Sequence, residues 1–355
     1  MTAVEANARP APRPFRIAHI SDLHVLELNG THWSRFLNKR ATGAVNLAGL
    51  RRNAHPVHVA ELLAERLRAE DIDHVILTGD LTNLALESEF ARVRQVVERI
   101  GPPDYITMIP GNHDMYTRGA LRHHRFERYF QDYLVDETDP LRSALTKGRL
   151  HYPFVRAPAP HVRIYGLSSA IPTPPLLAFG HVGRAQLDRL RALVAAEPPT
   201  VRVRIVLVHH NLHHRVGAAE YVASLIDRKA LGEAMHDIHA TVVLHGHTHH
   251  PHQGHLPGRR APVVTVRALA RADEVERKLD QAAAHQIGAD IPVIGCGSST
   301  LSRVGRAAKA RFNVLEVHEG HLERVSSFRL DGEQGEFLPE YDDLLHKALG
   351  RIIHT

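Results

Sequence analysis

The sequence contains very little cysteine and no long apolar run. Its single cysteine, Cys296, excludes an intramolecular disulfide. Nowhere does it reach the roughly eighteen consecutive apolar residues that a spanning helix needs, and residues 1–14 lack the apolar segment of a secretory signal. We therefore expect neither a membrane-spanning helix nor a signal peptide, and we expect the protein in the cytoplasm.

The chain also lacks a strong excess of charge of one sign. Its formal charge is +5 with histidine counted as neutral, which favours anionic substrates only weakly. The positive residues are spread along the chain rather than clustered with aromatic residues, so the pattern does not favour nucleic-acid binding. With 355 residues, the chain can form one large α/β domain or two smaller ones, and either can carry an enzyme active site.

Histidine is the residue type that stands out, with 29 copies. We expect most of these side chains to lie on the surface or behind a functional site rather than in it. Examples of such histidines are His123, His124, His213, His214, His250 and His252.

The order of apolar segments predicts an α/β fold. Strand, helix, strand, helix and strand follow one another through the first 115 residues, as in βαβ units. Further strands are expected later in the chain, with Glu319 and Gly320 forming a hairpin turn. Two packed mixed β-sheets flanked by helices fit this pattern best. The expected strands are 15–20, 74–77, 105–109, 151–155, 162–167, 203–208, 241–244, 292–294, 312–317 and 322–330.

The remaining segments divide the chain into a domain, two inserts and two ends. Residues 1–14, rich in alanine and proline, are expected to form a flexible arm, and residues 15–330 the domain. A basic insert spans 33–52, and a charged, helix-prone insert spans about 267–286. Residues 331–355 are expected to form a polar tail with a short helix near 341–353.

Five short polar segments each follow an apolar, strand-like run. Because such runs deliver side chains to one edge of a sheet, we expect the segments to converge there. Carboxylates, an amide and paired imidazoles together suit first-row transition metals better than magnesium or calcium. The segments are Asp22-Leu23-His24, Gly79-Asp80, Gly111-Asn112-His113-Asp114, His209-His210 and Gly246-His247-Thr248-His249.

This set of segments resembles the signature of the calcineurin-like metallophosphoesterase superfamily, whose fold is a four-layer αββα sandwich. The resemblance implies two transition-metal ions, with Mn, Fe or Zn expected. It places Asp22, His24, Asp80 and His249 on one ion, and Asp80, Asn112, His209 and His247 on the other, with Asp80 bridging. Of the adjacent pair, His209 is favoured over His210 because it lies at the end of the strand.

The resemblance further implies hydrolysis of a phosphoester by a metal-bridging hydroxide. His113 would protonate the leaving group or stabilise charge in the transition state, and Asp114 would hold His113 in place. Both residues are therefore expected to serve catalysis.

Among subgroups, the sequence looks most like bacterial class III cyclic-nucleotide phosphodiesterases, so a small phosphodiester is the expected substrate. That group often has His-His-Pro-Pro where this chain has His209-His210-Asn211-Leu212. The alternatives are a nucleotide-sugar lipid pyrophosphate hydrolase, a phosphomonoesterase, or a scaffold without catalysis. The 33–52 insert could contact a membrane surface peripherally, although a basic helical cap is the simpler interpretation. A homodimer is a further expectation.

Overall fold

The computed structural model describes residues 13–32, 55–135, 152–213, 222–260, 286–287, 289–301, 309–331 and 335–350. Its α-helices are α2 (Val57–Ala69), α3 (Glu87–Ile100), α4 (Arg118–Arg122), α5 (Arg125–Phe130), α6 (Arg184–Ala195), α8 (Arg228–Asp237) and α10 (Leu344–Leu349). Two short 3₁₀ helices are η3 (Pro103–Tyr105) and η4 (Gln131–Leu134).

The strands form two six-stranded sheets and one small ribbon. They are β1 (Phe15–Ile20), β2 (His74–Leu77), β3 (Ile106–Met108), β4 (Phe154–Ala159), β5 (Val162–Gly166), β6 (Val203–Leu207), β7 (Val242–His245), β8 (His252–Leu256), β9 (Arg259–Arg260), β10 (Gln286–Ile287), β11 (Ile291–Gly295), β12 (Arg311–His318), β13 (His321–Asp331) and β14 (Glu336–Tyr341).

The first sheet has the order β14-β13-β12-β1-β2-β3. Strands β1, β2 and β3 are parallel, and the crossovers between them carry α2 and α3, as the βαβ prediction required. Strands β12, β13 and β14 continue the sheet antiparallel from β1. The turn between β12 and β13 contains Glu319 and Gly320 with φ of 49° and 81°, which is the left-handed backbone that a tight hairpin needs.

The second sheet has the order β4-β5-β6-β7-β11-β8. Strands β5, β6, β7 and β11 run parallel, whereas the two edge strands β4 and β8 are antiparallel to their neighbours. Both sheets are therefore mixed, and each delivers the carboxyl ends of its parallel strands to one edge.

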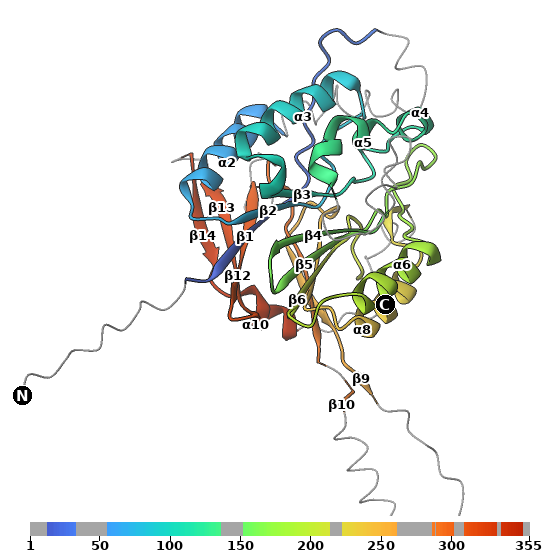
Figure 1. The fold of residues 1–355 in the computed structure, drawn as a ribbon. Coiled ribbons are helices and arrows are strands. Elements are labelled where there is room, and N and C mark those ends of the chain that lie inside the picture. The colour runs from blue at the N-terminus through green and yellow to red at the C-terminus, as the bar shows by residue number, and fades with distance from the viewer. Residues whose placement is uncertain are drawn as a thin grey trace, which may run out of the picture.

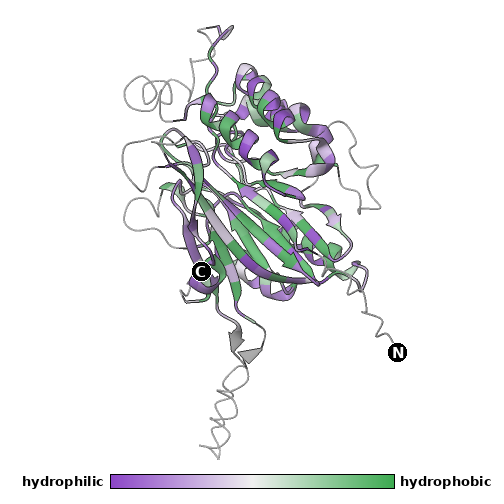
Figure 2. Cartoon of the chain, turned by 90° about the vertical axis from the view of Figure 1, so that its left-hand side faces the viewer, coloured by the Kyte–Doolittle hydropathy of each residue, from purple (hydrophilic) through white to green (hydrophobic). Residues whose placement is uncertain are grey.

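The two sheets pack face to face and helices cover their outer sides (Figure 1). Alternation along β6 shows the layers: Val203, Ile205 and Leu207 belong to the core between the sheets, whereas Val206 faces α6 and α8. Apolar colour is accordingly concentrated in the strands, and the helices are mixed (Figure 2). The prediction of an α/β fold with two packed mixed sheets and flanking helices is confirmed.

The last part of the chain contains the short helix expected near 341–353, but it also contains a strand and packs on the domain instead of forming a polar tail. Residues 336–341 form β14, which pairs with β13, and α10 packs on β8, β11 and β13. Its residues Leu344 and Ala348 are buried, so burial of an apolar stripe fixes this helix to the domain.

Several expected segments lie outside the described residues. These are the 33–52 insert, most of the 1–14 arm and the 267–286 insert except for Gln286, which belongs to β10. Among the helices that the structure does describe, none combines the length and the apolar character needed to cross a membrane.

Candidate metal centre

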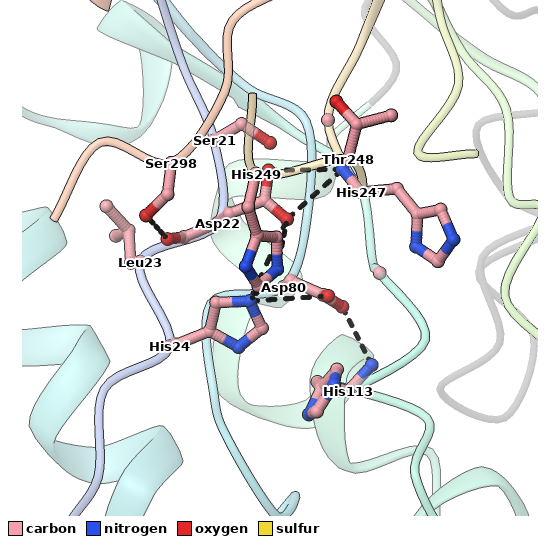
Figure 3. Close-up of polar contacts among 12 residues, drawn as sticks. Ser21, Asp22, Leu23, His24, Asp80, His113, His247, Thr248, His249 and Ser298 are labelled. Carbon is pink, nitrogen blue, oxygen red and sulfur yellow. Dashed lines mark hydrogen bonds and ion pairs between the residues drawn. The ribbon is translucent and has the colours of Figure 1, made fainter. Parts of the chain in front are cut away.

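The five predicted segments come together at the carboxyl ends of the parallel strands. Each begins within a few residues of the end of β1, β2, β3, β6 or β7. Because the two sheets face each other, segments from both meet in one buried place (Figure 3). All seven predicted metal ligands lie there, although their roles as ligands remain predictions.

The first group contains Asp22, His24, Asp80 and His249. One donor atom of each lies within 4.8 Å of one donor atom of the others. His24 Nε2 is 2.8 Å from His249 Nε2 and 3.6 Å from an oxygen of Asp80, while His249 Nε2 is 3.6 Å from Asp22. The two imidazole nitrogens therefore converge with two carboxylates on one small volume.

The second group contains Asp80, His209 and His247, again within 4.8 Å of one another. His209 Nε2 is 3.3 Å from Asp80 and 3.1 Å from the amide oxygen of Asn112, and His247 Nδ1 is 2.9 Å from the same amide oxygen. Asp80 belongs to both groups, which is the position expected of a bridging ligand.

The adjacent histidines of the fourth segment point in different directions. His209 is fully buried and faces Asp80, with Nδ1 2.7 Å from the carbonyl of Thr78. His210 turns to the other side, where its Nδ1 is 2.8 Å from Ser169 Oγ and its Nε2 is 3.0 Å from the carbonyl of Ala178. This geometry favours His209 as the ligand.

Five of the predicted ligands have a left-handed backbone. Their φ angles lie between 46° and 67°, a region that residues other than glycine seldom occupy and that is most accessible to asparagine, aspartate and histidine. Each such residue costs about 1–3 kcal/mol, and strain of this kind tends to be stored where function requires it. The five are Asp22, His24, Asp80, His247 and His249.

His113 lies beside the two groups, held through both its backbone and its ring. Its backbone N–H donates to Asp80 Oδ1 at 2.7 Å, and its Nδ1 lies 2.6 Å from the carbonyl oxygen of Asn83. Because a carbonyl only accepts, Nδ1 carries the proton, and a second proton on the ring would sit on Nε2. The ring meets His24 edge to face, with centroids 4.7 Å apart, and stacks on Tyr116 at 5.3 Å.

The carboxylate of Asp114 contacts backbone groups of the loop that carries His113 and of the loop before it; its role in holding His113 in place stays a prediction. Its carboxylate accepts from the backbone N–H groups of Leu81, Thr82 and Gly111, at 3.2, 2.8 and 2.9 Å, and from the hydroxyl of Thr82 at 2.9 Å. Asp114 thus joins the loop after β2 to the loop after β3. The carbonyl of Asn83 is what orients the imidazole.

The charges of the centre are strongly coupled. Burial, together with the charge of Asp80, raises the pKa of Asp22 to about 7. Burial also works against ionisation of Asp80, but the imidazoles of His209 and His113 hold its pKa well below the usual range. Burial lowers the pKa of His209, yet Asp80 more than offsets this and raises it to about 9. The two buried carboxylates therefore need positive charge beside them.

Some supporting residues carried no signal in the sequence. Ser298, in the loop after β11, donates through its hydroxyl to the carbonyl of Asp22 at 2.8 Å, and Thr300 donates to the carbonyl of Leu23 at 2.7 Å. His55, at the start of the α2 segment, places its ring 4.8 Å from that of His24. These contacts join residues that lie far apart along the chain, so the order of residues in the sequence does not indicate them.

Residues 15–251 match the model of the calcineurin-like phosphoesterases. The chain belongs to this family. Among curated protein sequences, none matches it.

Solved structures agree with the family at the level of the fold. A dimetal phosphatase from Danio rerio aligns over 93% of this chain and 99% of its own, with a TM-score of 0.52 and 12% identity. A purple acid phosphatase from yellow lupin (Lupinus luteus) seeds aligns over 94% of this chain and 55% of its own, with a TM-score of 0.50 and 13% identity.

The residues present fit a pair of metal ions. Two buried carboxylates and several imidazoles converge, and five of these residues have a left-handed backbone. Imidazole and carboxylate together suit first-row transition metals. This family member is therefore a metal-dependent phosphoesterase with a candidate dinuclear His/Asp centre.

Proposed function

We propose that this chain is a phosphodiesterase that uses two transition-metal ions, with Mn, Fe and Zn as the candidates. The observation that carries the proposal is the position of Asp80, which belongs to both groups of donor atoms. A protein that served only as a scaffold and bound no metal would not need a complete set of ligands with strained or buried positions. The complete set of ligands therefore favours a catalytic function.

The protein residues have separate roles in this reaction. When bound, two cations would supply a nucleophile from water near neutral pH and neutralise charge on the phosphoryl oxygens. Asp80, Asp22 and the histidines would hold the ions. Asn112 would add a neutral oxygen, which reduces the positive charge of the ions less than a further carboxylate would.

His113 is the proton donor in this proposal. With Nδ1–H bound to the Asn83 carbonyl, the second proton of the imidazolium sits on Nε2. That proton passes to the oxygen of the leaving alcohol as its bond to phosphorus breaks, and the neutral ring keeps its Nδ1–H bond throughout. The stacked Tyr116 limits rotation of the ring.

A cavity that approaches the centre along the chain favours a diester over a monoester. It has a volume of about 620 Å³, and none of the predicted ligands lines it. Met115, close after His113, and Ser168, next to the residue that contacts His210, bound it. Arg118 and Arg122 line it together with Glu127 and apolar side chains. Such a cavity has room for a second esterified group and offers positive charge to an anionic one.

Variants of Asp80 and His113 test the division of roles. We expect Asp80→Ala to lose both metal and activity. His113→Ala is expected to keep its metal while turnover falls about 10²- to 10⁴-fold, the usual contribution of a general acid. Metal content is measured by mass spectrometry and turnover with a chromogenic diester. His123→Ala, at an exposed neighbouring histidine, is the control. Equal metal loss in the Asp80 and His113 variants would contradict the assignment.

The substrate class is tested by comparing bis(p-nitrophenyl) phosphate with p-nitrophenyl phosphate in the presence of manganese. Faster hydrolysis of the diester supports the proposal, and a panel of cyclic nucleotides then tests the class III resemblance. Faster hydrolysis of the monoester identifies a phosphomonoesterase. Hydrolysis of a nucleotide-sugar lipid pyrophosphate alone supports that alternative, and no activity on any of them supports a scaffold.

The sequence supports two further proposals, on location and membrane contact. We propose a cytoplasmic protein whose 33–52 segment, with five basic residues beside apolar ones, contacts anionic membrane surfaces. Co-sedimentation with anionic vesicles, with and without this segment, tests the contact. Equal sedimentation of the two forms would contradict it.

A further inference from the structure

Three histidines that the dinuclear centre does not use lie together at the same edge of the second sheet. His213 follows β6, His245 ends β7 and His252 begins β8. One ring nitrogen of each lies within 4.8 Å of a ring nitrogen of the others. The rings of His213 and His252 are parallel with centroids 3.4 Å apart, and the ring of His245 lies 5.8 and 6.0 Å from theirs. The sequence prediction that placed His213 and His252 on the surface or behind the site missed this cluster.

The register of the sheet explains how His245 and His252 approach each other. Strand β11 lies between β7 and β8, and Gly295 pairs with His245 on one side and His252 on the other. Residues in register across neighbouring strands share a face of the sheet. Gly295 therefore lies between the two imidazoles on the same face of the sheet. Because glycine has no side chain, no side chain stands between them.

His245 occupies the space that this glycine leaves. A Cβ atom at position 295 would lie 2.5 Å from His245 Cε1 and 2.9 Å from His245 Nε2. The imidazole thus leans over Gly295 toward the strand that carries His252, and any larger residue at position 295 would displace it.

His245 is prepared to act as a ligand. It is fully buried, and its Nδ1 lies 3.0 Å from the carbonyl oxygen of Gly246, so Nδ1 carries the proton and Nε2 the lone pair. Among the described residues, none provides a hydrogen bond to Nε2. A buried polar atom without a partner costs about 1–3 kcal/mol, which a cation at Nε2 would recover. A backbone carbonyl on the second nitrogen is also how metal-binding histidines are usually oriented.

We propose that His213, His245 and His252 bind a third transition-metal ion, separate from the dinuclear centre. Imidazole ligands suit Zn²⁺, and three of them leave one position of a tetrahedral ion for water. Zn–N distances of about 2.0–2.1 Å place the nitrogens of a tetrahedral site roughly 3.4 Å apart, so the nitrogens need to approach by about 1.4 Å at most. Because an ion lies in the plane of each imidazole that binds it, the stacked rings of His213 and His252 must also turn relative to each other. His213 and His252 are only half-buried as residues, although the Nδ1 atom of each is buried.

The donor atoms of this cluster, like those of the predicted dinuclear centre, lie close enough together to bind one ion. The group of Asp22, His24, Asp80 and His249 meets the same limit of 4.8 Å between donor atoms. Each histidine of the third site also shares a segment with a predicted ligand, two to four residues along the chain: His209, His247 or His249. A metal there would tie together the three segments that present these ligands, and so stabilise the dinuclear centre from behind.

The experiment counts zinc equivalents by mass spectrometry in the full chain, after loading with Zn²⁺ and dialysis against a competing chelator. We expect three equivalents in the wild type, two in His252→Asn, and three in the control His250→Asn, an exposed histidine of the same segment. Two equivalents in the wild type would overturn the proposal. So would an unchanged count in His252→Asn.

Two further measurements keep the proposal testable if His252→Asn does not fold. His213→Asn is expected to lose one equivalent in the same way. In crystals of the wild type, anomalous scattering at the zinc edge should give a peak between the three rings, and its absence from crystals grown with zinc would overturn the proposal. Neither readout depends on hydrolysis, so the third site and the phosphodiesterase proposal can fail independently.

Discussion

The carboxylate of Asp114 offers the sharpest test of how the centre is held together. It is fully buried and accepts three backbone N–H groups and one hydroxyl from the two loops that carry Asp80 and Asn112. Asp114→Ala leaves these donors buried without an acceptor. We therefore expect a large loss of stability together with weaker metal retention.

The magnitude follows from the number of donors. Each buried N–H without a partner costs about 1–3 kcal/mol, so three of them cost roughly 3–9 kcal/mol before relaxation. Water entering the vacated space moves the value toward the lower end, and we expect a loss of about 3–5 kcal/mol. Asp114→Asn keeps one acceptor oxygen and is expected to lose less.

Urea unfolding followed by circular dichroism, with EDTA present to remove metal linkage, measures these free energies. Asp104→Ala, at an exposed aspartate in η3, is the control and is expected to stay within about 0.5 kcal/mol of the wild type. A loss below about 1 kcal/mol in Asp114→Ala would refute the reasoning, because the loops would then be held by other contacts.

Two further predictions concern packing and pH. A Cβ atom at Gly246 would overlap Ser21 Oγ, so we expect Gly246→Ala to lower the metal content. The control Gly119→Ala should keep its metal, because its Cβ would meet its nearest neighbouring atom only at 3.8 Å. Equal metal content in the two variants would contradict this prediction. Burial lowers the pKa of His74 in the folded protein to about 3. As the pH falls, the unfolded state therefore binds this proton before the folded state does, and the free energy of unfolding decreases between about pH 6.5 and 3. His74→Phe should remove roughly 1 kcal/mol per pH unit from the slope of unfolding free energy between pH 6 and 4, and parallel slopes in wild type and variant would count against it.

Most of the fold could be predicted because its central strands are continuous apolar runs. The segment 203–208 is an example, predicted within one residue of β6. Four strands were missed, of which β9 and β10 have only two residues each. The other two, β8 and β14, are edge strands with weak patterns. His252–Leu256 has two histidines, a glutamine and a glycine, and Glu336–Tyr341 contains Pro339 and two glutamates, a composition tolerated where only one neighbour must be paired.

The positions of the predicted ligands could be anticipated because each follows a strand directly. The groups that orient these side chains could not be anticipated. The carbonyl of Asn83 holds His113, and any residue there would supply a carbonyl, so no side chain marks the position. The role of Gly295 depends on the pairing of three strands, which the order of residues along the chain does not give.

The hydrogen bonds from the loop after β11 have a consequence for where this protein can be divided. Every predicted ligand of the dinuclear centre lies before residue 250, so a fragment ending there would look complete by its motifs. It would lack Ser298 and Thr300, which hold the backbone of Asp22 and Leu23, and Ser299, whose N–H donates to the carbonyl of Ser21 at 2.8 Å. It would also leave β1 without β12 as a neighbour. The unit needed to bind metal at the dinuclear centre therefore extends well beyond the last ligand of that centre, and cleavage after residue 250 is expected to abolish binding there even though none of its ligands is removed.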